Sequence, residues 1–196
     1  EAKLGQPMLN WNLYGEGGTL AVYLLPYFRE RTLAGADGRL RPPVVVDTDN
    51  PQYESAQAEQ NLDFALRWSR QFDTLDLAVS YFEGNNREPV FLPTATGQLQ
   101  PLYLQMQQLG LEAQFISGSW IWKLEAIRRS SDIEQFSAAV AGFEYTTVGA
   151  FDSAVDLGWL LEYQYDNRGL AANSMKLYKQ AIGSFNRSLA CQTNSF

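Results

Sequence analysis

The sequence predicts an all-β fold, an antiparallel up-and-down meander of about eight strands. Two observations carry this prediction. Apolar and polar residues alternate with a period of two in eight stretches, and tight turns separate pairs of these stretches. Helical spacing fits none of the stretches as well. The chain of 196 residues is long enough for one domain with a sizeable core, and we expect a β domain over 1–169 with a separate tail over 170–196.

The eight predicted strands are defined by their apolar residues. In chain order these are Leu9, Trp11 and Leu13; Leu20, Val22, Leu24 and Phe28; Leu62, Phe64, Leu66 and Trp68; Leu75, Leu77, Val79 and Tyr81; Leu109, Leu111, Ala113 and Phe115; Trp120, Trp122, Leu124 and Ala126; Ala141, Phe143 and Tyr145; and Leu157, Trp159, Leu161, Tyr163 and Tyr165. The residues between them are mostly polar or small, so each strand has one apolar and one polar face.

The connections between the predicted strands differ in length. Tight turns are expected at "GEGG" (15–18), "QFDT" (71–74) and "ISGS" (116–119), with "VGAFDSAVD" (148–156) as a somewhat longer member of the series. Long polar connections are expected at 32–60, 84–101 and 129–136. Short and long connections thus alternate strictly in this prediction, which is typical of a meander with one smooth rim and one elaborated rim.

The tight turns also predict a register. If "SG" at 117–118 is the two-residue loop of its hairpin, Glu112 lies directly opposite Lys123. Such a pair of opposite charges stabilises a ladder by roughly 0.2–1 kcal/mol. In the preceding hairpin we expect 72–73 as the loop. Both assignments keep apolar residues opposite apolar ones and polar residues opposite polar ones.

The composition of the two faces favours a barrel that spans a bilayer. The apolar face carries essentially no charge, and its Trp and Tyr residues are expected to form the aromatic girdles of such a barrel. These lipid-belt candidates are Trp11, Trp68, Tyr81, Trp120, Trp122, Tyr145, Trp159, Tyr163 and Tyr165. The opposite face mixes small and charged residues, as expected for a crowded lumen. Its lumen-lining candidates are Asp63, Arg67, Asp76, Glu112, Lys123, Glu125, Glu144 and Glu162.

Three runs of the chain carry a resemblance to a known group of proteins. The runs "LPYFRERTLAGADGRLRPPVVVDTDNPQYESA", "LDFALRWSRQFDTLDLAVSYFEGNNREPVFLP" and "WIWKLEAIRR" resemble bacterial outer-membrane β-barrel proteins of porin-like type. The resemblance covers residues 1 to about 169. It implies a location in the bacterial outer membrane, contact with the lipid bilayer, and either passive passage of small solutes or a structural role.

The end of the chain departs from this pattern. After "GWLLEYQYDNRG" the alternation stops, and several apolar residues of 170–196 fall at helical spacing. We expect a short helical or disordered tail there. If the short turns lie on the periplasmic side, the first strand begins outside and the eighth ends outside. Because intact barrels of this kind keep both termini in the periplasm, the sequence predicts an incomplete barrel.

A second class of function stays open at this point. A soluble β-barrel or sandwich that binds an apolar ligand on the aromatic face would show the same alternation. Likewise, the charged lumen candidates either bias the passage of solutes or only pair with one another inside a narrow, filled barrel. Dependence of the folded chain on detergent distinguishes the two classes.

Composition excludes several other functions. There is no histidine and only one cysteine, Cys191, which removes His-based triads, Cys–His pairs and the usual zinc sites. The net charge of −7 leaves no basic face for nucleic acid. The acidic loops "GADG" (35–38) and "DTDN" (47–50) lack the ligand spacing of calcium loops, so turn chemistry explains them better. We expect no catalysis, no metal and no cofactor.

Overall fold

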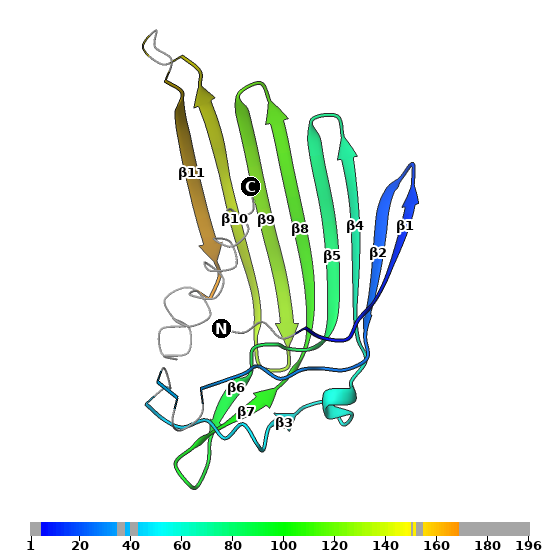
Figure 1. Ribbon diagram of the computed structural model, residues 1–196, viewed down its shortest axis with the longest axis vertical. Coiled ribbons are helices and arrows are strands. Elements are labelled where there is room, and N and C mark those ends of the chain that lie inside the picture. Colours follow the sequence, from blue (N-terminus) through cyan, green and yellow to red (C-terminus); the bar gives the residue numbers. More distant parts are fainter. Residues whose placement is uncertain (1–4, 35–37, 40–42, 150, 152–154, 169–196) are drawn as a thin grey trace. The chain divides into compact units, whose positions relative to one another are not determined.

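The structure is a computed structural model that describes residues 5–34, 38–39, 43–149, 151 and 155–168. The described residues are all-β, as predicted. Eight strands form one antiparallel sheet in the order β1-β2-β4-β5-β8-β9-β10-β11, so each strand pairs with its neighbours in sequence (Figure 1). This confirms the up-and-down meander. The tail over 170–196, for which we predicted a helical or disordered end, lies outside the described residues.

Most strands are longer than the alternation indicated, but β2 ends at Leu25, so the prediction that Phe28 belongs to this strand is wrong. The large sheet contains β1 (Leu9–Gly15), β2 (Gly18–Leu25), β4 (Asp63–Phe72), β5 (Leu75–Asn85), β8 (Gln105–Ser117), β9 (Trp120–Ser131), β10 (Gln135–Thr147) and β11 (Leu157–Asp166). A second sheet in the order β3-β7-β6 contains β3 (Gln52–Tyr53), β6 (Val90–Pro93) and β7 (Leu99–Tyr103), and a 3₁₀ turn, η1 (Ala58–Gln60), lies nearby.

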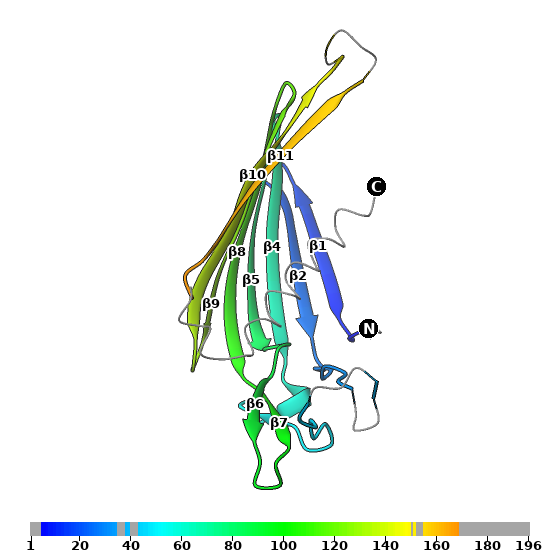
Figure 2. The same cartoon turned by 90° about the vertical axis from the view of Figure 1, so that its left-hand side faces the viewer.

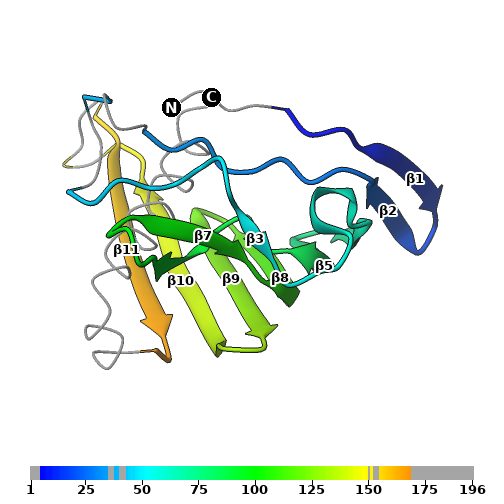
Figure 3. The same cartoon turned by 90° about the horizontal axis from the view of Figure 1, so that it is seen from below.

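The large sheet is open. Strands β1 and β11 are its two edges, so within the described residues it does not close into a barrel. Figure 3, which looks along the strands, shows that the sheet is curved. The second sheet lies at the end of the strands opposite the short hairpin turns (Figure 2).

Each face of the large sheet is shared by all eight strands, because directly paired residues point to the same side. Trp122 pairs with Phe115 on β8 and with Phe143 on β10. We call the side that carries Trp122 the apolar face. Lys123, the next residue along β9, lies on the other side, which we call the polar face. The predicted separation of apolar and polar side chains is thus present across the sheet.

The register within two hairpins differs from the predicted one. The loops are 118–119 and 73–74, one residue later than predicted. Gly118 adopts a φ of 58° and is the first loop residue, the position at which a type II′ turn requires glycine. As a result Glu112 lies opposite Glu125, and the predicted pairing of Glu112 with Lys123 is wrong. The shift moves partners by two positions, so it leaves the faces unchanged.

The predicted strict alternation of short and long connections is also wrong. Most of the connection expected at 129–136 belongs to strands, since β9 ends at Ser131 and β10 begins at Gln135. The connection expected at 84–101 contains β6 and part of β7, which the sequence analysis did not identify. The elaborated rim therefore consists of the two connections that follow β2 and β5.

These two connections fold into a compact layer, which we call the loop cap (26–34, 43–62 and 86–104). Its buried core includes Phe28 and Tyr103. The Phe28 ring packs edge-on against Tyr103, with centroids 4.9 Å apart, and Tyr103 stacks on Tyr53 at 5.4 Å. Phe136 of β10 is buried as well. The cap thus supplies the conventional core that a single curved sheet lacks.

Asp63 anchors the loop cap to the sheet. We expected this residue to line the lumen, but it is fully buried. Its Oδ1 accepts hydrogen bonds from Asn61 Nδ2 at 2.7 Å and from the backbone N–H of Asn85 at 3.0 Å. Arg87 Nη1 lies 2.7 Å from Oδ2 and forms an ion pair with it. The Arg87 guanidinium in turn lies over the rings of Phe28 and Phe82.

Gly84 makes room for this anchor and yields a prediction. It has a φ of +152°, and a Cβ at this position would lie 2.3 Å from Asp63 Cγ. We expect Gly84→Ala to lower the free energy of unfolding by about 2–3 kcal/mol, because it combines a disfavoured backbone conformation with a clash against a buried carboxylate. Denaturant titration in detergent micelles measures this loss.

The matched control is Gly158→Ala, because an added Cβ there meets nothing within 4 Å. It should leave the free energy of unfolding unchanged or raise it slightly, since alanine restricts the unfolded chain. Equal losses in the two variants would show that Gly84 has no special role.

Candidate functional site: the polar face and the apolar band

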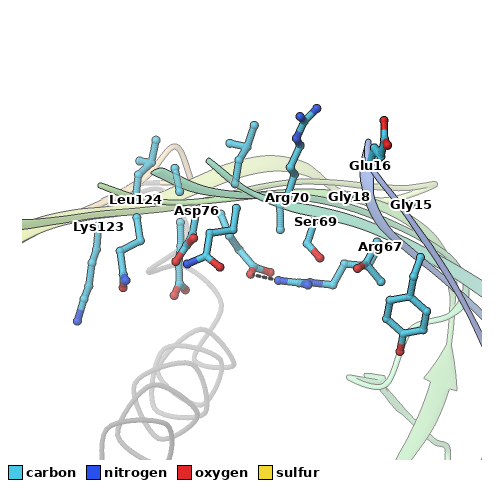
Figure 4. Close-up of a pocket in the computed structure, with 18 residues that line it drawn as sticks. Gly15, Glu16, Gly18, Arg67, Ser69, Arg70, Asp76, Lys123 and Leu124 are labelled. Atoms are coloured by element: carbon cyan, nitrogen blue, oxygen red, sulfur yellow. Dashed lines mark hydrogen bonds and ion pairs between the residues drawn. The ribbon is translucent and has the colours of Figure 1, made fainter. Parts of the chain in front are cut away.

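A hollow of about 750 Å³ lies against the polar face, toward the short hairpin turns. Residues from several strands line it, among them Arg67, Asp76, Glu112, Lys123 and Glu125. Figure 4 shows Lys123, Asp76, Ser69 and Arg67 on one side of the sheet, with Leu124 and Arg70 on the other. The hollow therefore brings together charged residues that are far apart in the sequence.

One ion pair crosses the hollow over an intervening strand. Arg67 Nη2 of β4 lies 2.7 Å from Glu112 Oε2 of β8, although β5 runs between them. The polar-face residues of β5 that pair with them in the ladders are Ser80 and Ala78. Because these side chains are small, two long side chains can meet above the strand. Both partners are about half exposed, so the pair contributes at most about 1 kcal/mol.

A second ion pair joins β9 and β10. Lys123 Nζ lies 2.5 Å from Glu144 Oε1. Gly142 lies directly opposite Lys123, and a Cβ on Gly142 would come within 2.4 Å of the Leu161 backbone oxygen. The glycine thus permits β10 and β11 to approach closely on the polar side. Lys123 is on the predicted face but has a different partner from the predicted one.

The remaining lumen candidates lie on the same face. Asp76 pairs with Gln71 in the ladder, and Glu125 lies opposite Glu112, without an ion pair for Asp76 or Glu125 within the described part of the chain. Glu162 of β11 lies beside Gly142. Seven of the eight candidates therefore share an accessible face, and only Asp63 is buried beneath the loop cap.

All nine lipid-belt candidates lie on the apolar face. The largest aromatic group is at the short-turn end of β9 and β10, where Trp120 stacks on Trp122 with centroids 5.5 Å apart and contacts Tyr145 at 4.4 Å. Most of these side chains are exposed, with Trp11 at 70% and Trp122 at 46% of their full exposure. Within the described residues, nothing covers them.

The hairpins are staggered in a regular way. Gly18, the first residue of β2, lies at the same height along the sheet as Arg70 of β4. Strand β4 continues for two more residues, to Phe72, before the turn of the next hairpin. Phe72 of β4 and Phe115 of β8 both lie at the height of Leu75 on β5. Strand β8 again continues for two more residues, to Ser117, before the turn of the third hairpin. Each hairpin tip is therefore displaced by two residues from the tip before it.

This stagger corresponds to a tilt. A shift of two residues, about 6.8 Å, for every two strands, about 9.6 Å, means that the strands lean by about 35° from the normal to the line of hairpin tips. Strands of closed barrels lean by about 35–45° from the barrel axis. The register of this open sheet therefore has the slope that a barrel wall needs.

The other boundary of the apolar residues has the same slope. Phe64 on β4 pairs with Glu83 on β5, and Leu109 on β8 pairs with Arg128 on β9. Counted from the short turns toward the loop cap, Phe64 and Leu109 are the last apolar residues of their strands on this face. Glu83 and Arg128 are the first charged residues beyond the apolar stretches of the neighbouring strands. The apolar residues thus form a band whose two boundaries run parallel to each other and oblique to the strands. We call it the apolar band.

The apolar band has a measurable height. On β4 it extends from Phe64 to Phe72, and on β5 only from Leu75 to Tyr81. These spans are about 27 Å and about 20 Å along the strand, or about 22 Å and about 17 Å perpendicular to the line of the tips. The outward apolar band of outer-membrane barrels is about 25 Å tall. The band therefore approaches this height on β4 and is lower on β5.

The loop cap carries the perturbed titratable groups that lie outside the large sheet. Burial raises the pKa of the Glu30 carboxyl, and Glu59 nearby adds to that rise, while the Tyr53 hydroxyl donates a hydrogen bond to Glu30 and opposes it. Burial also raises the pKa of Tyr53. Glu59 accepts a 3.0 Å hydrogen bond from the Tyr27 hydroxyl. These hydrogen bonds join two segments of the cap, 26–34 and 43–62.

Sequence reasoning missed the loop cap, although one signal for it was present. "VFLP" and "QLQPLY" flank "TATG" at 94–97, and Gly97 adopts a φ of +78° in the turn that joins β6 to β7. That is a hairpin pattern, shortened by prolines. The buried pair of Asp63 and Arg87 has no local signal, because its partners are brought together only by the fold.

Two other kinds of feature are absent from the described residues. No helix there is long and apolar enough to cross a membrane. No group of three or more potential metal ligands is found in the same part of the chain. Comparisons with protein-family models, with curated proteins and with solved structures gave no match.

The pKa shift of Glu30 yields a prediction about pH. Its folded-state pKa is raised above the ordinary value of 4.5, so the folded chain binds more protons, and stability falls as pH rises from about 4.5 through the folded-state pKa. Glu30→Gln removes this dependence. We expect its melting temperature, relative to the unsubstituted chain, to increase between about pH 4 and pH 8. Glu16→Gln, at an exposed turn, is the control, and an identical pH profile for both variants would contradict the prediction.

Proposed function

We propose that the eight-stranded sheet is part of the wall of an outer-membrane-type β-barrel that passes small polar solutes without chemistry. In this proposal the apolar face contacts lipid, the polar face lines a lumen, and the location is the bacterial outer membrane. The loop cap lies at one rim, and the short hairpin turns lie at the other. Lipid and small solutes are the partners.

The apolar band is the observation that carries this proposal. A bilayer is a slab with two parallel surfaces, so lipid-facing residues must follow its plane and not the register of tilted strands. The band does this: its boundary steps from Phe64 to Tyr81 and from Leu109 to Ala126 in parallel with the hairpin tips. The core of a soluble barrel need not have a boundary that follows one oblique line from strand to strand.

The two edges of the sheet impose a condition on the proposal. Lipid cannot hydrogen-bond to the free N–H and C=O groups of an open edge, so β1 and β11 need further pairing in a bilayer. The two edge strands run in opposite directions (Figure 1), and an even number of antiparallel strands can therefore close through them. Neither edge strand contains a proline, and β1 contains no charged residue, so both are suited to pairing.

One observation favours the alternative, a soluble β protein that binds an apolar ligand. A hollow of about 540 Å³ lies on the apolar face, lined among others by Phe115, Trp122, Phe143 and Leu161. Its volume suits a small apolar molecule. In that case a further layer of protein would have to cover the rest of the apolar face. A chain that stays monodisperse in plain buffer would favour this alternative over the bilayer.

Trp122→Arg tests the orientation of the apolar face. Trp122 lies inside the apolar band, so on our proposal an arginine there must enter the hydrocarbon region. Because Trp122 lies toward the short-turn end of the band, we expect the substitution to disfavour insertion into lipid vesicles by less than the cost of arginine at the bilayer midplane, about 2–4 kcal/mol, but by more than the loss of a charge on the polar face. The shift of Trp fluorescence on addition of vesicles, together with protection from added protease, measures insertion.

The matched control is the adjacent Lys123→Ala. It removes an ion pair on the polar face whose partners are about half exposed, so insertion should change by less than about 1 kcal/mol. If Lys123→Ala blocks insertion while Trp122→Arg does not, the faces are reversed and the lipid-facing assignment is wrong.

The charges of the polar face predict ion selectivity. The seven accessible lumen candidates comprise five carboxylates and two cations, which favours the passage of cations. We expect Glu125→Gln combined with Asp76→Asn to reduce the preference for potassium over chloride, measured as the reversal potential of planar bilayers under a salt gradient. Asp49→Asn, in the loop cap, is the control. A lumen filled by its own ion pairs would show no conductance in any variant.

A further inference from the structure

Three charged residues lie on the apolar face of the eight described strands, namely Arg70, Glu83 and Arg128, and all are near a boundary of the apolar band. Glu83 accepts a 2.7 Å hydrogen bond from the Tyr81 hydroxyl. The Arg70 guanidinium lies over the ring of Phe72, 4.6 Å from its centroid. Arg128 has no such neighbour among the contacts of the described residues, and it is exposed.

The surroundings of Arg128 change character along β9. Ala126, two residues before it, is on the side of the apolar band, and Ser130, two residues after it, is on the side of the loop cap. In the ladders Arg128 lies opposite Leu109 on one side and Ser137 on the other. The guanidinium is therefore flanked by hydrocarbon in one direction and by small polar groups in the other.

The position of Arg128 at the boundary of the apolar band, with neither an acidic nor an aromatic partner among the described residues, points to a ligand. Within the described part of the chain no carboxylate forms an ion pair with Arg128, whereas Arg67 and Arg87 each have one. Arg70 of the apolar face forms no ion pair there either, but its guanidinium lies over the Phe72 ring. A guanidinium offers donors in a planar fork that matches a phosphate group through two parallel hydrogen bonds. At a bilayer boundary, the phosphate of a lipid headgroup is the anion at that depth.

We infer that Arg128 binds the phosphate group of an anionic lipid at the rim that carries the loop cap. This inference rests on the proposed function and adds to it a lipid class and a residue. The acyl chains of the same molecule lie along Leu109 and Ala126 and the rest of the apolar band. A free phosphate ion could bind the guanidinium but could not contact Leu109 or Ala126. A lipid headgroup is therefore favoured over free phosphate as the bound anion.

Reconstitution of Arg128→Gln tests the inference. The chain is inserted into vesicles of phosphatidylcholine that contain a minor share of fluorescent phosphatidylglycerol, and energy transfer from its tryptophans reports the lipid next to the protein. We expect the preference for phosphatidylglycerol to fall about fivefold in the variant, as for the loss of one arginine near a membrane surface. Inorganic phosphate in the buffer should not displace the labelled lipid.

The matched control is Arg29→Gln, which removes the same charge from an exposed position in the loop cap. Its preference for phosphatidylglycerol should be that of the unsubstituted chain. An unchanged preference in Arg128→Gln, an equal loss in Arg29→Gln, or displacement by inorganic phosphate overturns the inference while leaving the proposed function intact. Failure of the unsubstituted chain to insert overturns the proposed function, and the inference with it.

Discussion

The two-residue stagger between successive hairpins is the constraint on which the architecture depends. It sets the slope of the strands, and the side-chain alternation of each strand then places every residue at a defined height as well as on a defined face. Had the hairpins ended level with one another, the apolar stretches of β4 and β9 would form a band at right angles to the strands. Instead, Phe64 and Ala126 lie at opposite ends of an oblique boundary. The proposed contact with a bilayer requires that obliquity.

Small residues on the polar face make this arrangement compatible with charge. A Cβ on Gly110 would lie 2.4 Å from Ser80 Oγ, and one on Gly142 would meet the backbone of β11. Side chains on the inner side of a curved sheet converge, so bulk there would resist curvature. With Ala78 and Ser80 on β5, the Arg67–Glu112 ion pair can extend across the strand. Curvature and a charged lining thus depend on the same small residues.

The sequence determined the faces but not the register or the cap. Period-two alternation is a local property, and it placed Trp122 and Lys123 on opposite sides correctly. The register depends on which residue of a turn accepts a positive φ, and Gly118 occupies the first loop position where the second was predicted. The cap depends on contacts such as Phe28 with Tyr103, whose partners are separated by much of the chain. Neither composition nor alternation carries information about such contacts.

The location of the buried core has a consequence for how the wall is stabilised. Phe28, Tyr103 and Phe136 are buried at the cap, whereas the apolar side chains of the wall, such as Trp11, remain exposed. A single sheet gains stability in water only when a second layer covers its apolar face, and the described residues contain no such layer. The wall must therefore be stabilised by a partner outside those residues. Lipid meets this requirement over the whole band at once, whereas a small ligand in the hollow beside Phe115 would cover only a fraction of it.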